Sequence, residues 1–140
     1  LLGKIISRFE EKGFQIIGLK MVHISETLAR KHYAEHEGRD FFESLVKYTT
    51  SAPVLVIVLK GKNVVEIARK MMGATFGFRA EPGTIRGDYA VSNRFNLIHG
   101  SDSLASAERE IGIFFHKGEL FEYDPADLTW VYDISTGDIV

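Results

Sequence analysis

Apolar residues recur every three or four positions at the start of the chain, and a run of strand-forming residues follows them. Positions 1, 2, 5, 6 and 9 are apolar, which predicts an amphipathic helix that ends near Gly13. The segment FQIIGLKMV at 14–22 favours a strand. Ser25 is a good N-cap residue, so we expect a helix over 25–36, and residues 40–50 repeat the helical pattern.

The middle of the chain contains the clearest strand. Residues 54–60, VLVIVLK, are apolar on both faces, which predicts a central position in a sheet. Asn63 and Glu66 have the spacing of a capping box at the start of a helix. We therefore expect a helix over 63–72 that is closed by Gly73.

No hydrophobic period holds in the next segment. Residues 73–92 contain four glycines and one proline, so we expect a long ordered loop, and loops of this length are usually functional. FNLIH at 95–99 favours a third short strand. Ser103 can cap a last helix whose apolar positions continue to 114, and the tail over 118–140 carries one apolar anchor, TWVYD.

The order of these elements indicates the fold class. Strands that alternate with helices are typical of α/β and α+β proteins. One strand before Leu1 would complete a βαββαβ order, the ferredoxin-like sandwich in which helices cover an antiparallel sheet. We predict this α+β fold, with its first strand absent from the printed sequence. Because the chain has 140 residues and no linker or repeat, we expect residues 1–140 to form a single domain.

Composition excludes several classes of protein. The formal net charge of −2 argues against a general nucleic-acid binder, and the absence of cysteine excludes thiolate catalysis and cysteine-ligated zinc. The longest apolar run, 54–59, is far shorter than a membrane span, and the N-terminus lacks the apolar core of a signal peptide. We expect a soluble, cytoplasmic protein with no nucleic-acid or membrane partner.

The histidine in FNLIHGSDS is the first candidate for chemistry. His99 stands at the carboxyl end of the expected strand, and Gly100 removes side-chain bulk beside it. The residues that follow lead into a helix N-terminus, where free N–H groups favour an anion. Glu110 lies later on that helix, at a position from which its carboxylate could orient the imidazole of His99. From spacing alone, His99 is either a nucleophile beside a phosphate site or a packed core histidine.

A second set of residues is cationic or hydroxylated. Arginines and threonines on a glycine-bearing loop suit recognition of phosphate through several bonds, although single arginines are more often solvated surface residues. The loop has no P-loop or Rossmann fingerprint. The residues of this set are Arg69, Thr75, Arg79, Thr84 and Arg86.

Two further clusters have alternative interpretations. Tyr33, Phe41, Phe42 and Leu45 could form one wall for a planar base, or they could be ordinary core residues. His32 and His36 are four residues apart on a predicted helix and could chelate a metal. No third ligand for such a metal is evident from the sequence.

These segments together resemble one family. NLIHGSDS, followed by SAEREI, resembles the active-site signature of the nucleoside diphosphate kinases. RFEEKGFQIIGLKM, HYAEHEGRDFFESLVKY, GKNVVEIARKMMGAT and PGTIRGDYA resemble further family segments in the same order. The resemblance extends from Leu1 to about Asp133.

The resemblance implies an activity and a role for each site residue. It implies a Mg²⁺-dependent ping-pong enzyme that moves the γ-phosphoryl group of ATP, GTP or another nucleoside triphosphate to a nucleoside diphosphate through a phosphohistidine. Stacking on the base without reading its edges would allow many bases. The implied roles are His99 as nucleophile; Glu110 and Ser101 as supports of its ring; Arg69, Thr75 and Arg86 as phosphate ligands with Tyr33 nearby; Asn96 at the sugar; Phe41 on the base with Leu45 beneath; and Asp102 near Mg²⁺ or holding the loop.

The sequence departs from the family pattern at three places. A first strand with a Lys-Pro-Asp-Gly-like end does not precede Leu1, so we interpret the sequence as an incomplete copy of a longer protein. Phe-Gly-Phe-Arg follows Thr75 in a loop that makes subunit contacts in the family, and Asn93 stands where a small apolar residue is common near the base. A tail with Trp130, Val131 and Tyr132 resembles that of the hexameric members. The alternative is an interaction or regulatory domain of the same fold with impaired catalysis, but all the implied site residues are present.

Overall fold

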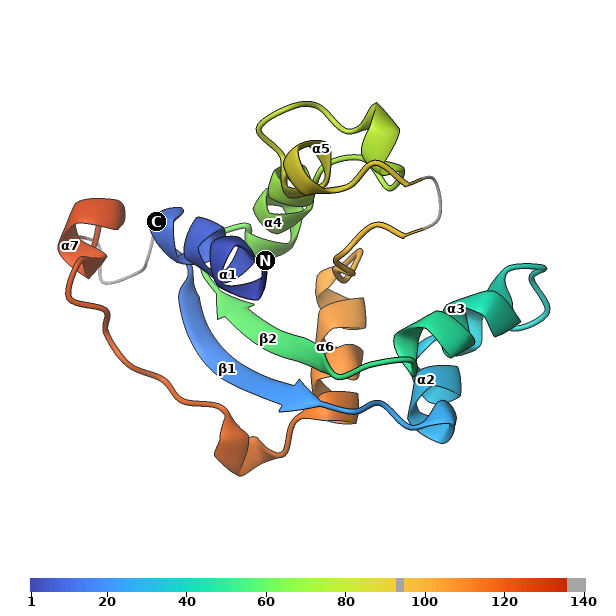
Figure 1. Ribbon diagram of the computed structural model, residues 1–140. Coiled ribbons are helices and arrows are strands. Elements are labelled where there is room, and N and C mark those ends of the chain that lie inside the picture. Colours follow the sequence, from blue (N-terminus) through green and yellow to red (C-terminus); the bar gives the residue numbers. More distant parts are fainter. Residues whose placement is uncertain (93–94, 136–140) are drawn as a thin grey trace.

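The computed structural model describes residues 1–92 and 95–135, in which helices surround a two-stranded sheet (Figure 1). Asn93 lies outside the described residues. Three single 3₁₀ turns, Ala34–His36, Gly77–Arg79 and Lys117–Glu119, connect longer elements. The elements in chain order are α1 (Leu2–Glu11), β1 (Gln15–Val22), α2 (Glu26–His32), α3 (Phe42–Thr49), β2 (Val54–Lys60), α4 (Val64–Met72), α5 (Ile85–Tyr89), α6 (Leu104–Phe114) and α7 (Leu128–Val131).

The sheet pairs β1 with β2 in antiparallel register. Gln15 lies opposite Lys60 at one end and Val22 opposite Val54 at the other, with one irregularity just before Gly18. A Cβ at Gly18 would lie 2.8 Å from a methyl of Leu120, so this glycine allows the chain after α6 to pack closely on β1. Strands and helices that pack in this way confirm the α+β class.

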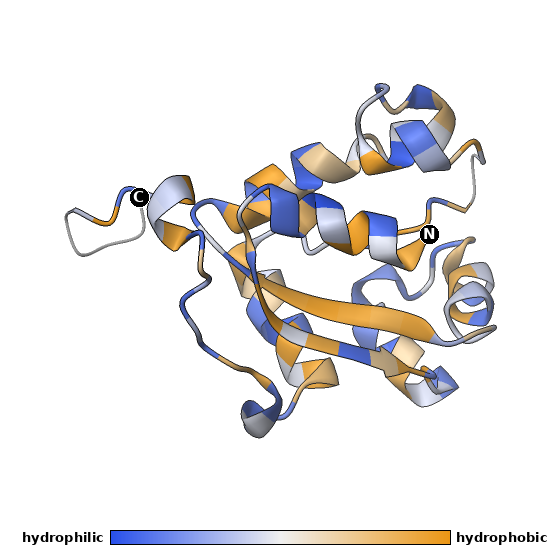
Figure 2. Ribbon diagram, turned by 60° about the vertical axis from the view of Figure 1, so that its left-hand side comes forward, coloured by the Kyte–Doolittle hydropathy of each residue, from blue (hydrophilic) through white to orange (hydrophobic). Residues whose placement is uncertain are grey.

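The core lies in two clusters. The first joins α1, α4 and α5 to β2, with Phe9 and Ile85 as its largest fully buried side chains. β2 is hydrophobic along nearly its whole length (Figure 2), but the described sheet has only two strands, so β2 does not have the central position predicted for it. The second cluster joins α2 and α3 around Ala29 and Phe42 and includes Phe114 at the end of α6. Because Phe114 packs against this cluster, α6 is fixed beside α2, and this contact positions the candidate site.

Two of the three predicted helix caps are confirmed. The Ser25 hydroxyl accepts a hydrogen bond from the Leu28 N–H, and the Ser103 hydroxyl accepts one from the Ser106 N–H. The predicted capping box at Asn63 is wrong, because Asn63 has a φ of 50° and its side chain makes no cap hydrogen bond. In this left-handed conformation, which asparagine tolerates well, Asn63 helps the chain turn from β2 into α4.

The predictions for the segment after α4 need correction. The segment 73–92, expected as a long ordered loop, contains the turn Gly77–Arg79 and the short helix α5. The expected strand over 95–99 does not form. Leu97 has a φ of 68°, and the Ile98 N–H donates to the Asn96 carbonyl at 2.8 Å, which closes a γ-turn. This turn breaks the extended backbone just before His99.

The tail is anchored as predicted, although not by its tryptophan. The Tyr132 hydroxyl donates to the Gly13 carbonyl at 3.0 Å, and Val131 packs so closely on Gly13 that a Cβ there would overlap its methyl. Trp130 is 89% exposed. Within the described part of the chain, no helix has the length and apolar character needed to cross a membrane.

Candidate functional site

The candidate site forms where residues 95–103 lead into α6. Gly100 is packed tightly, since a Cβ there would lie 2.6 Å from the Met72 sulfur of α4. The Ser103 cap then fixes the first turn of α6. His99 is therefore held between the γ-turn before it and a tightly packed glycine after it, and its side chain remains 47% exposed.

Glu110 connects His99 to Ser101. His99 Nε2 lies 3.4 Å from Glu110 Oε1, and the Ser101 hydroxyl donates to Glu110 Oε2 at 2.5 Å. Burial opposes ionisation of Glu110, but hydrogen bonds from His99 and Ser101 outweigh burial and lower its pKa to about 2. A buried carboxylate thus stays ionised at neutral pH and faces the Nε2 edge of the imidazole.

The rings of His32, the last residue of α2, and Tyr33, which follows it, also pack on the His99 ring. His32 meets it edge to face with ring centroids 4.9 Å apart, and Tyr33 does so at 5.8 Å. Burial, followed by the nearby His99, lowers the pKa of His32 to about 4, so His32 is neutral at neutral pH. Burial raises the pKa of the Tyr33 hydroxyl. These contacts fix the orientation of His99 through packing.

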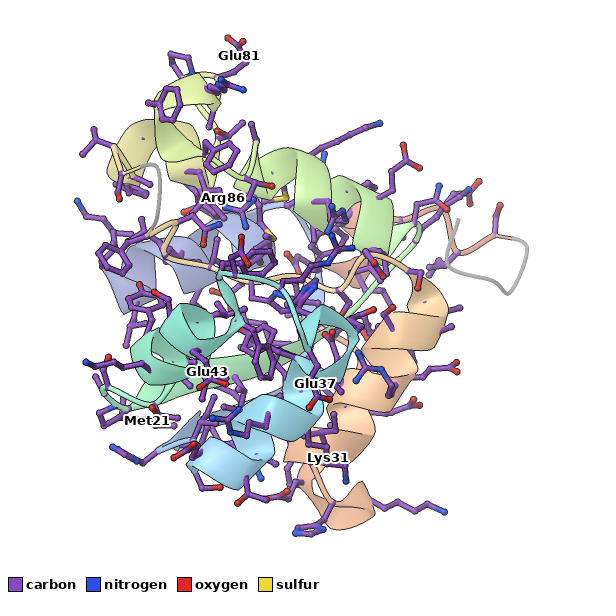
Figure 3. The ribbon with its side chains drawn as sticks, turned by 90° about the vertical axis from the view of Figure 1, so that its right-hand side faces the viewer. Met21, Lys31, Glu37, Glu43, Glu81 and Arg86 are labelled. Atoms are coloured by element: carbon purple, nitrogen blue, oxygen red, sulfur yellow. The ribbon has the colours of Figure 1, made fainter. Side chains whose placement is uncertain are left out.

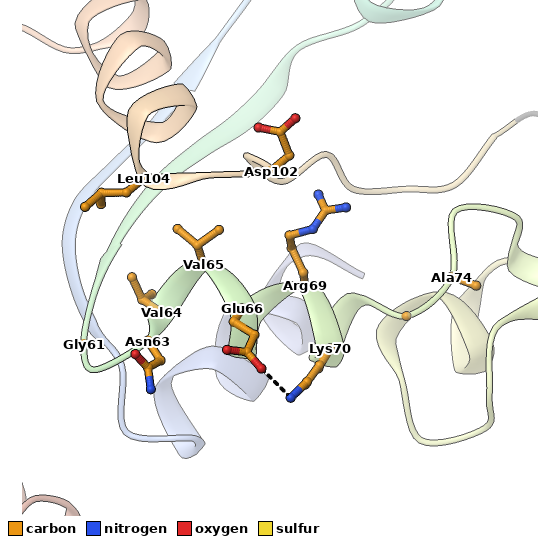
Figure 4. Close-up of a pocket in the computed structure, with 11 residues that line it drawn as sticks. Gly61, Asn63, Val64, Val65, Glu66, Arg69, Lys70, Ala74, Asp102 and Leu104 are labelled. Carbon is orange, nitrogen blue, oxygen red and sulfur yellow. Dashed lines mark hydrogen bonds and ion pairs between the residues drawn. The ribbon is translucent and has the colours of Figure 1, made fainter. Parts of the chain in front are cut away.

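An open pocket of about 860 Å³ adjoins this loop (Figure 4). Its wall includes Arg69 and Lys70 of α4, with Asp102 and Leu104 on the opposite side. Arg69 Nη1 donates to the Gly100 carbonyl at 3.2 Å, which places the pocket next to His99. His99 itself is outside the pocket wall.

Asp102 is an ionised carboxylate at this edge of the site. The Ser106 hydroxyl donates to its Oδ1 at 2.6 Å. This bond, with help from Ser103 and the charge of Arg69, lowers the pKa of Asp102 below its ordinary value. Oxygen ligands of this kind suit a hard divalent cation such as Mg²⁺.

Arg86 is buried and bonds to the backbone (Figure 3). Its guanidinium donates to the carbonyls of Gly73, Asn96 and Ile98 at 2.9, 3.3 and 2.6 Å. Burial lowers its pKa, but it remains a cation. Arg86 therefore ties the end of α4 to the γ-turn that precedes His99.

Asn96 and Thr75 are also linked. The Asn96 amide donates to the Thr75 carbonyl at 3.0 Å, which joins the loop after α4 to the His99 segment. Residues 73–75, 86 and 96–101 thus converge on one region, and the phosphate role expected of Arg69, Thr75 and Arg86 stays a prediction. Arg79 is separate from this network, because it stacks against Phe76 and Phe78 at 5.8 and 5.3 Å.

Only part of the predicted aromatic wall is exposed to solvent. Phe41 is 52% exposed, and its ring lies 5.5 Å from that of His36. Tyr33 stacks on the other side of His36 at 6.2 Å, while Leu45 packs against the core cluster of α2 and α3. The half-exposed ring of Phe41 is compatible with stacking of a planar group on it.

The structure also adds residues that the sequence did not connect with His99. His32 was singled out with His36 as a possible metal chelate, but the ligand atoms that converge belong to His32, His99 and Glu110. Arg109 Nη2 lies 3.7 Å from Glu110 Oε1 and 3.3 Å from Glu35 Oε1. His32 of α2 and Glu35 of the following 3₁₀ turn thus meet residues of α6 and its preceding loop, and a helical repeat within one segment cannot reveal a contact between two segments.

Comparison with known proteins gives one consistent family. The family model described as Nucleoside diphosphate kinase matches residues 1–120. The nucleoside diphosphate kinase of Desulforamulus reducens is 56% identical over 133 residues, which are 95% of this chain and 89% of that protein. That of Gloeobacter violaceus is 53% identical over the same shares of both chains.

Solved structures agree with the sequence comparison. The structure of a halophilic nucleoside diphosphate kinase from Halobacterium salinarum in complex with CDP is 46% identical, with a TM-score of 0.92 over 95% of this chain and 89% of that one. A nucleoside diphosphate kinase family protein from Babesia bovis is 33% identical, with a TM-score of 0.90 over 94% of this chain and 89% of that one. This likeness confirms the predicted ferredoxin-like arrangement, and the chain belongs to the nucleoside diphosphate kinase family, whose members are nucleotide-binding phosphotransferases.

Proposed function

We propose that the chain transfers the γ-phosphoryl group of a nucleoside triphosphate to a nucleoside diphosphate through a phosphohistidine on His99, with Mg²⁺ bound to the nucleotide. The observation that carries this proposal is the contact of His99 Nε2 with Glu110, whose carboxylate is held by Ser101. An ionised carboxylate favours the tautomer with its proton on Nε2. The lone pair on Nδ1 is then available for attack.

The two half-reactions follow from this tautomer. Nδ1 attacks the γ-phosphorus in line, the bond to the β–γ bridging oxygen breaks, and the nucleoside diphosphate leaves with the bond's electron pair. The ring then carries a positive charge next to the Glu110 carboxylate, which stabilises it. A second nucleoside diphosphate attacks the same phosphorus through its terminal oxygen and restores neutral His99. Donor and acceptor phosphoanhydrides have nearly equal energies, so positioning and charge neutralisation are sufficient for catalysis.

The phosphates need several cationic and polar partners. We assign Arg69, Thr75 and Arg86 to this task, because all three lie on the segments that converge on the His99 loop. Mg²⁺ would neutralise phosphate charge while held mainly by the nucleotide, and Asp102 is the carboxylate that we assign to it or to its waters. The ionised state of Asp102 and its position beside Arg69 support this assignment.

The nucleoside would be held largely by shape and stacking. We assign the base to Phe41, with Leu45 beneath it and Tyr33 nearby, and the sugar hydroxyl to Asn96. The exposure of Phe41 supports this assignment, as does the CDP complex of the Halobacterium salinarum relative, which binds a nucleotide on a closely similar fold. Because stacking does not read base edges, we expect ATP, GTP and pyrimidine nucleotides to serve as substrates.

The assembly and location of the protein belong to the same proposal. We infer one kinase domain over 1–140 that forms a homo-hexamer in the cytoplasm. Exposed apolar side chains on β1, among them Leu19 and Met21, give such an assembly surface to bury. Light scattering coupled to size exclusion should give about six chain masses of 15.7 kDa, and a monomer would contradict the hexamer.

Steady-state kinetics test the transfer mechanism. Double-reciprocal plots at several acceptor concentrations should give parallel lines with Mg²⁺, because donor and acceptor never share one complex. His99→Ala should abolish the activity, whereas His23→Ala, at an exposed histidine, should retain it. Intersecting lines, or an active His99→Ala variant, would overturn the proposal. An inactive wild-type protein that is fully folded would favour the impaired regulatory domain.

A further inference from the structure

Three side chains around the nucleophile have the composition of a metal site. His32, His99 and Glu110 each offer one ligand atom, and these atoms lie within 4.8 Å of one another. Two imidazole nitrogens and one carboxylate oxygen are a ligand set that Zn²⁺ takes in proteins, with water as the fourth ligand. Among residues 1–92 and 95–135, no other group of three such residues comes together.

The spacing of the first two ligand atoms suits coordination. His99 Nε2 and Glu110 Oε1 are 3.4 Å apart, which is longer than the usual hydrogen bond between nitrogen and oxygen. Two ligands at about 2.0–2.1 Å from a tetrahedral zinc ion are separated by roughly 3.4 Å. All three ligand atoms lie within 4.8 Å of one another, so a zinc ion would have to draw the side chains closer together, and the half-exposed His99 can shift towards the other two.

The ring of His32 packs edge to face on Tyr33, His99 and Phe114, but no hydrogen bond within the described residues competes for its Nδ1. It is only 6% exposed, and its Nδ1 is buried without a hydrogen-bond partner there. A buried imidazole usually has at least one such partner. The ring is thus a buried, polar group near an ionised carboxylate, and a cation bound at Nδ1 would give that nitrogen a partner.

We propose that His32, His99 and Glu110 form a regulatory zinc site that blocks phosphorylation of His99. Zinc on Nε2 takes that nitrogen's lone pair, so the single ring proton moves from Nε2 to Nδ1. Nδ1 then has no lone pair with which to attack phosphorus. The same carboxylate that orients the ring for catalysis becomes a zinc ligand, so the two states exclude one another. The inhibitory part of this inference rests on the proposed function, whereas the binding part does not.

One nearby charge opposes the cation. Arg109 Nη2 lies 3.7 Å from Glu110 Oε1, although it also pairs with Glu35 at 3.3 Å. Repulsion between exposed like charges at such distances is modest. Arg109→Gln should therefore strengthen zinc binding about three- to tenfold, a change that a site elsewhere on the surface would not show.

Calorimetric titration of the nucleotide-free protein with zinc chloride tests binding directly. We expect one zinc per chain, and Co²⁺ at the same site should give the visible absorption of a four-coordinate ion. His99→Asn should weaken binding at least tenfold, because the exposed His99 can be replaced without disturbing the core. His32→Asn should do the same if circular dichroism shows it folded, and His23→Asn should bind as the wild type does. Unchanged affinity of His99→Asn, or equal loss in His23→Asn, would overturn the site.

Inhibition is measured separately from binding. Transfer of label from γ-labelled ATP to the protein should fall in proportion to zinc occupancy and return when a chelator removes the metal. Arg109→Gln should be inhibited at lower free zinc than the wild type. If zinc binds as expected but labelling continues at full occupancy, the regulatory role is wrong while the site stands. If no label is taken up even without zinc, it is the proposed function that fails.

Discussion

The reactivity that we expect of His99 depends on the neighbouring side chains that hold its imidazole ring in one orientation. A free imidazole exchanges its proton between two nitrogens, whereas Glu110 favours the proton on Nε2 and Ser101 holds Glu110 in place. His32 and Tyr33 then pack edge to face on the ring and limit its rotation. In the mechanism that we propose, catalysis by His99 is therefore a property of a small network in which each member has one physical task.

Replacing Glu110 by Gln removes the charge but keeps the shape. The cationic phosphohistidine loses its partner, so kcat should fall roughly 10- to 100-fold, the equivalent of one hydrogen bond to a charged group. KM for the nucleotide should change little, since we assign Glu110 no nucleotide contact. Glu108→Gln, an exposed carboxylate on the same helix, should match the wild type in both constants. Equal activity of Glu110→Gln and wild type would rule out this role for Glu110.

The pairing of His99 with Glu110 could be predicted from the sequence, but not all the contacts of the site. The motif around His99 and the helical spacing to Glu110 pointed to the pair correctly. The contact of His32 with His99 could not be found, because it depends on how α2 packs against α6. Arg86 was expected at a phosphate, and in the structure its guanidinium is already bonded to three carbonyls.

At the scale of elements, the site depends on how the segments after α4 are tied together. Arg86 of α5 reaches the end of α4 and both sides of the γ-turn, while Asn96 reaches back to Thr75. These bonds hold Leu97 in a backbone conformation that costs a non-glycine residue free energy. Backbone strain of this kind persists when surrounding hydrogen bonds hold the residue in place, as those of Arg86 and Asn96 do for Leu97.

Arg86→Lys should destabilise the fold as well as weaken phosphate binding. One ammonium group cannot reach three separate carbonyls, so buried acceptors are left without donors. The free energy of unfolding in urea, measured without nucleotide, should fall by about 1–3 kcal/mol. Arg79→Lys is the matched control, because Arg79 stacks on exposed Phe76 and Phe78 at the surface and should be nearly neutral. If Arg86→Lys unfolds at the same urea concentration as the wild type, the stabilising role of the three Arg86 hydrogen bonds is contradicted.

Element prediction succeeded where local chemistry decides. Serine caps at 25 and 103 and the apolar run of β2 are signals carried by a few neighbouring residues. FNLIH reads as a strand by composition, yet Leu97 turns because residues distant in sequence hold it there. Asn63 fails as a cap for a related reason, since the tight connection from β2 to α4 places it in a left-handed conformation.

At the scale of the whole molecule, long-range ion pairs connect distant parts of the chain. Arg8 of α1 pairs with Asp88 of α5, and Asp88 also accepts a hydrogen bond from the Gly83 N–H at 2.7 Å. The Gly83 bond first, and Arg8 second, hold the pKa of Asp88 below its ordinary value. The pair closes the loop after α4 onto the first helix, over the core cluster that contains Phe9 and Ile85.

This pair makes a definite prediction for the dependence of stability on pH. Because the pKa of Asp88 is lower in the folded state than in the unfolded chain, its contribution is complete above about pH 4 and is lost as pH falls through the folded value. Asp88→Asn should therefore lower the urea midpoint at pH 7, and its difference from the wild type should shrink steadily below pH 4. Protein concentration must be kept fixed, since assembly also affects stability. A difference that stays constant across this range would contradict the assignment.

The central claim is that His99 carries the phosphoryl group between two nucleotides. The most direct test is to incubate the protein with Mg²⁺ and γ-labelled ATP without an acceptor, and then to measure phosphate on the protein. Phosphoryl transfer through His99 should give label that is lost in acid, stable in alkali, absent from His99→Ala and discharged by added nucleoside diphosphate. A wild-type protein that takes up no label, or a His99→Ala variant that is labelled equally well, would contradict it.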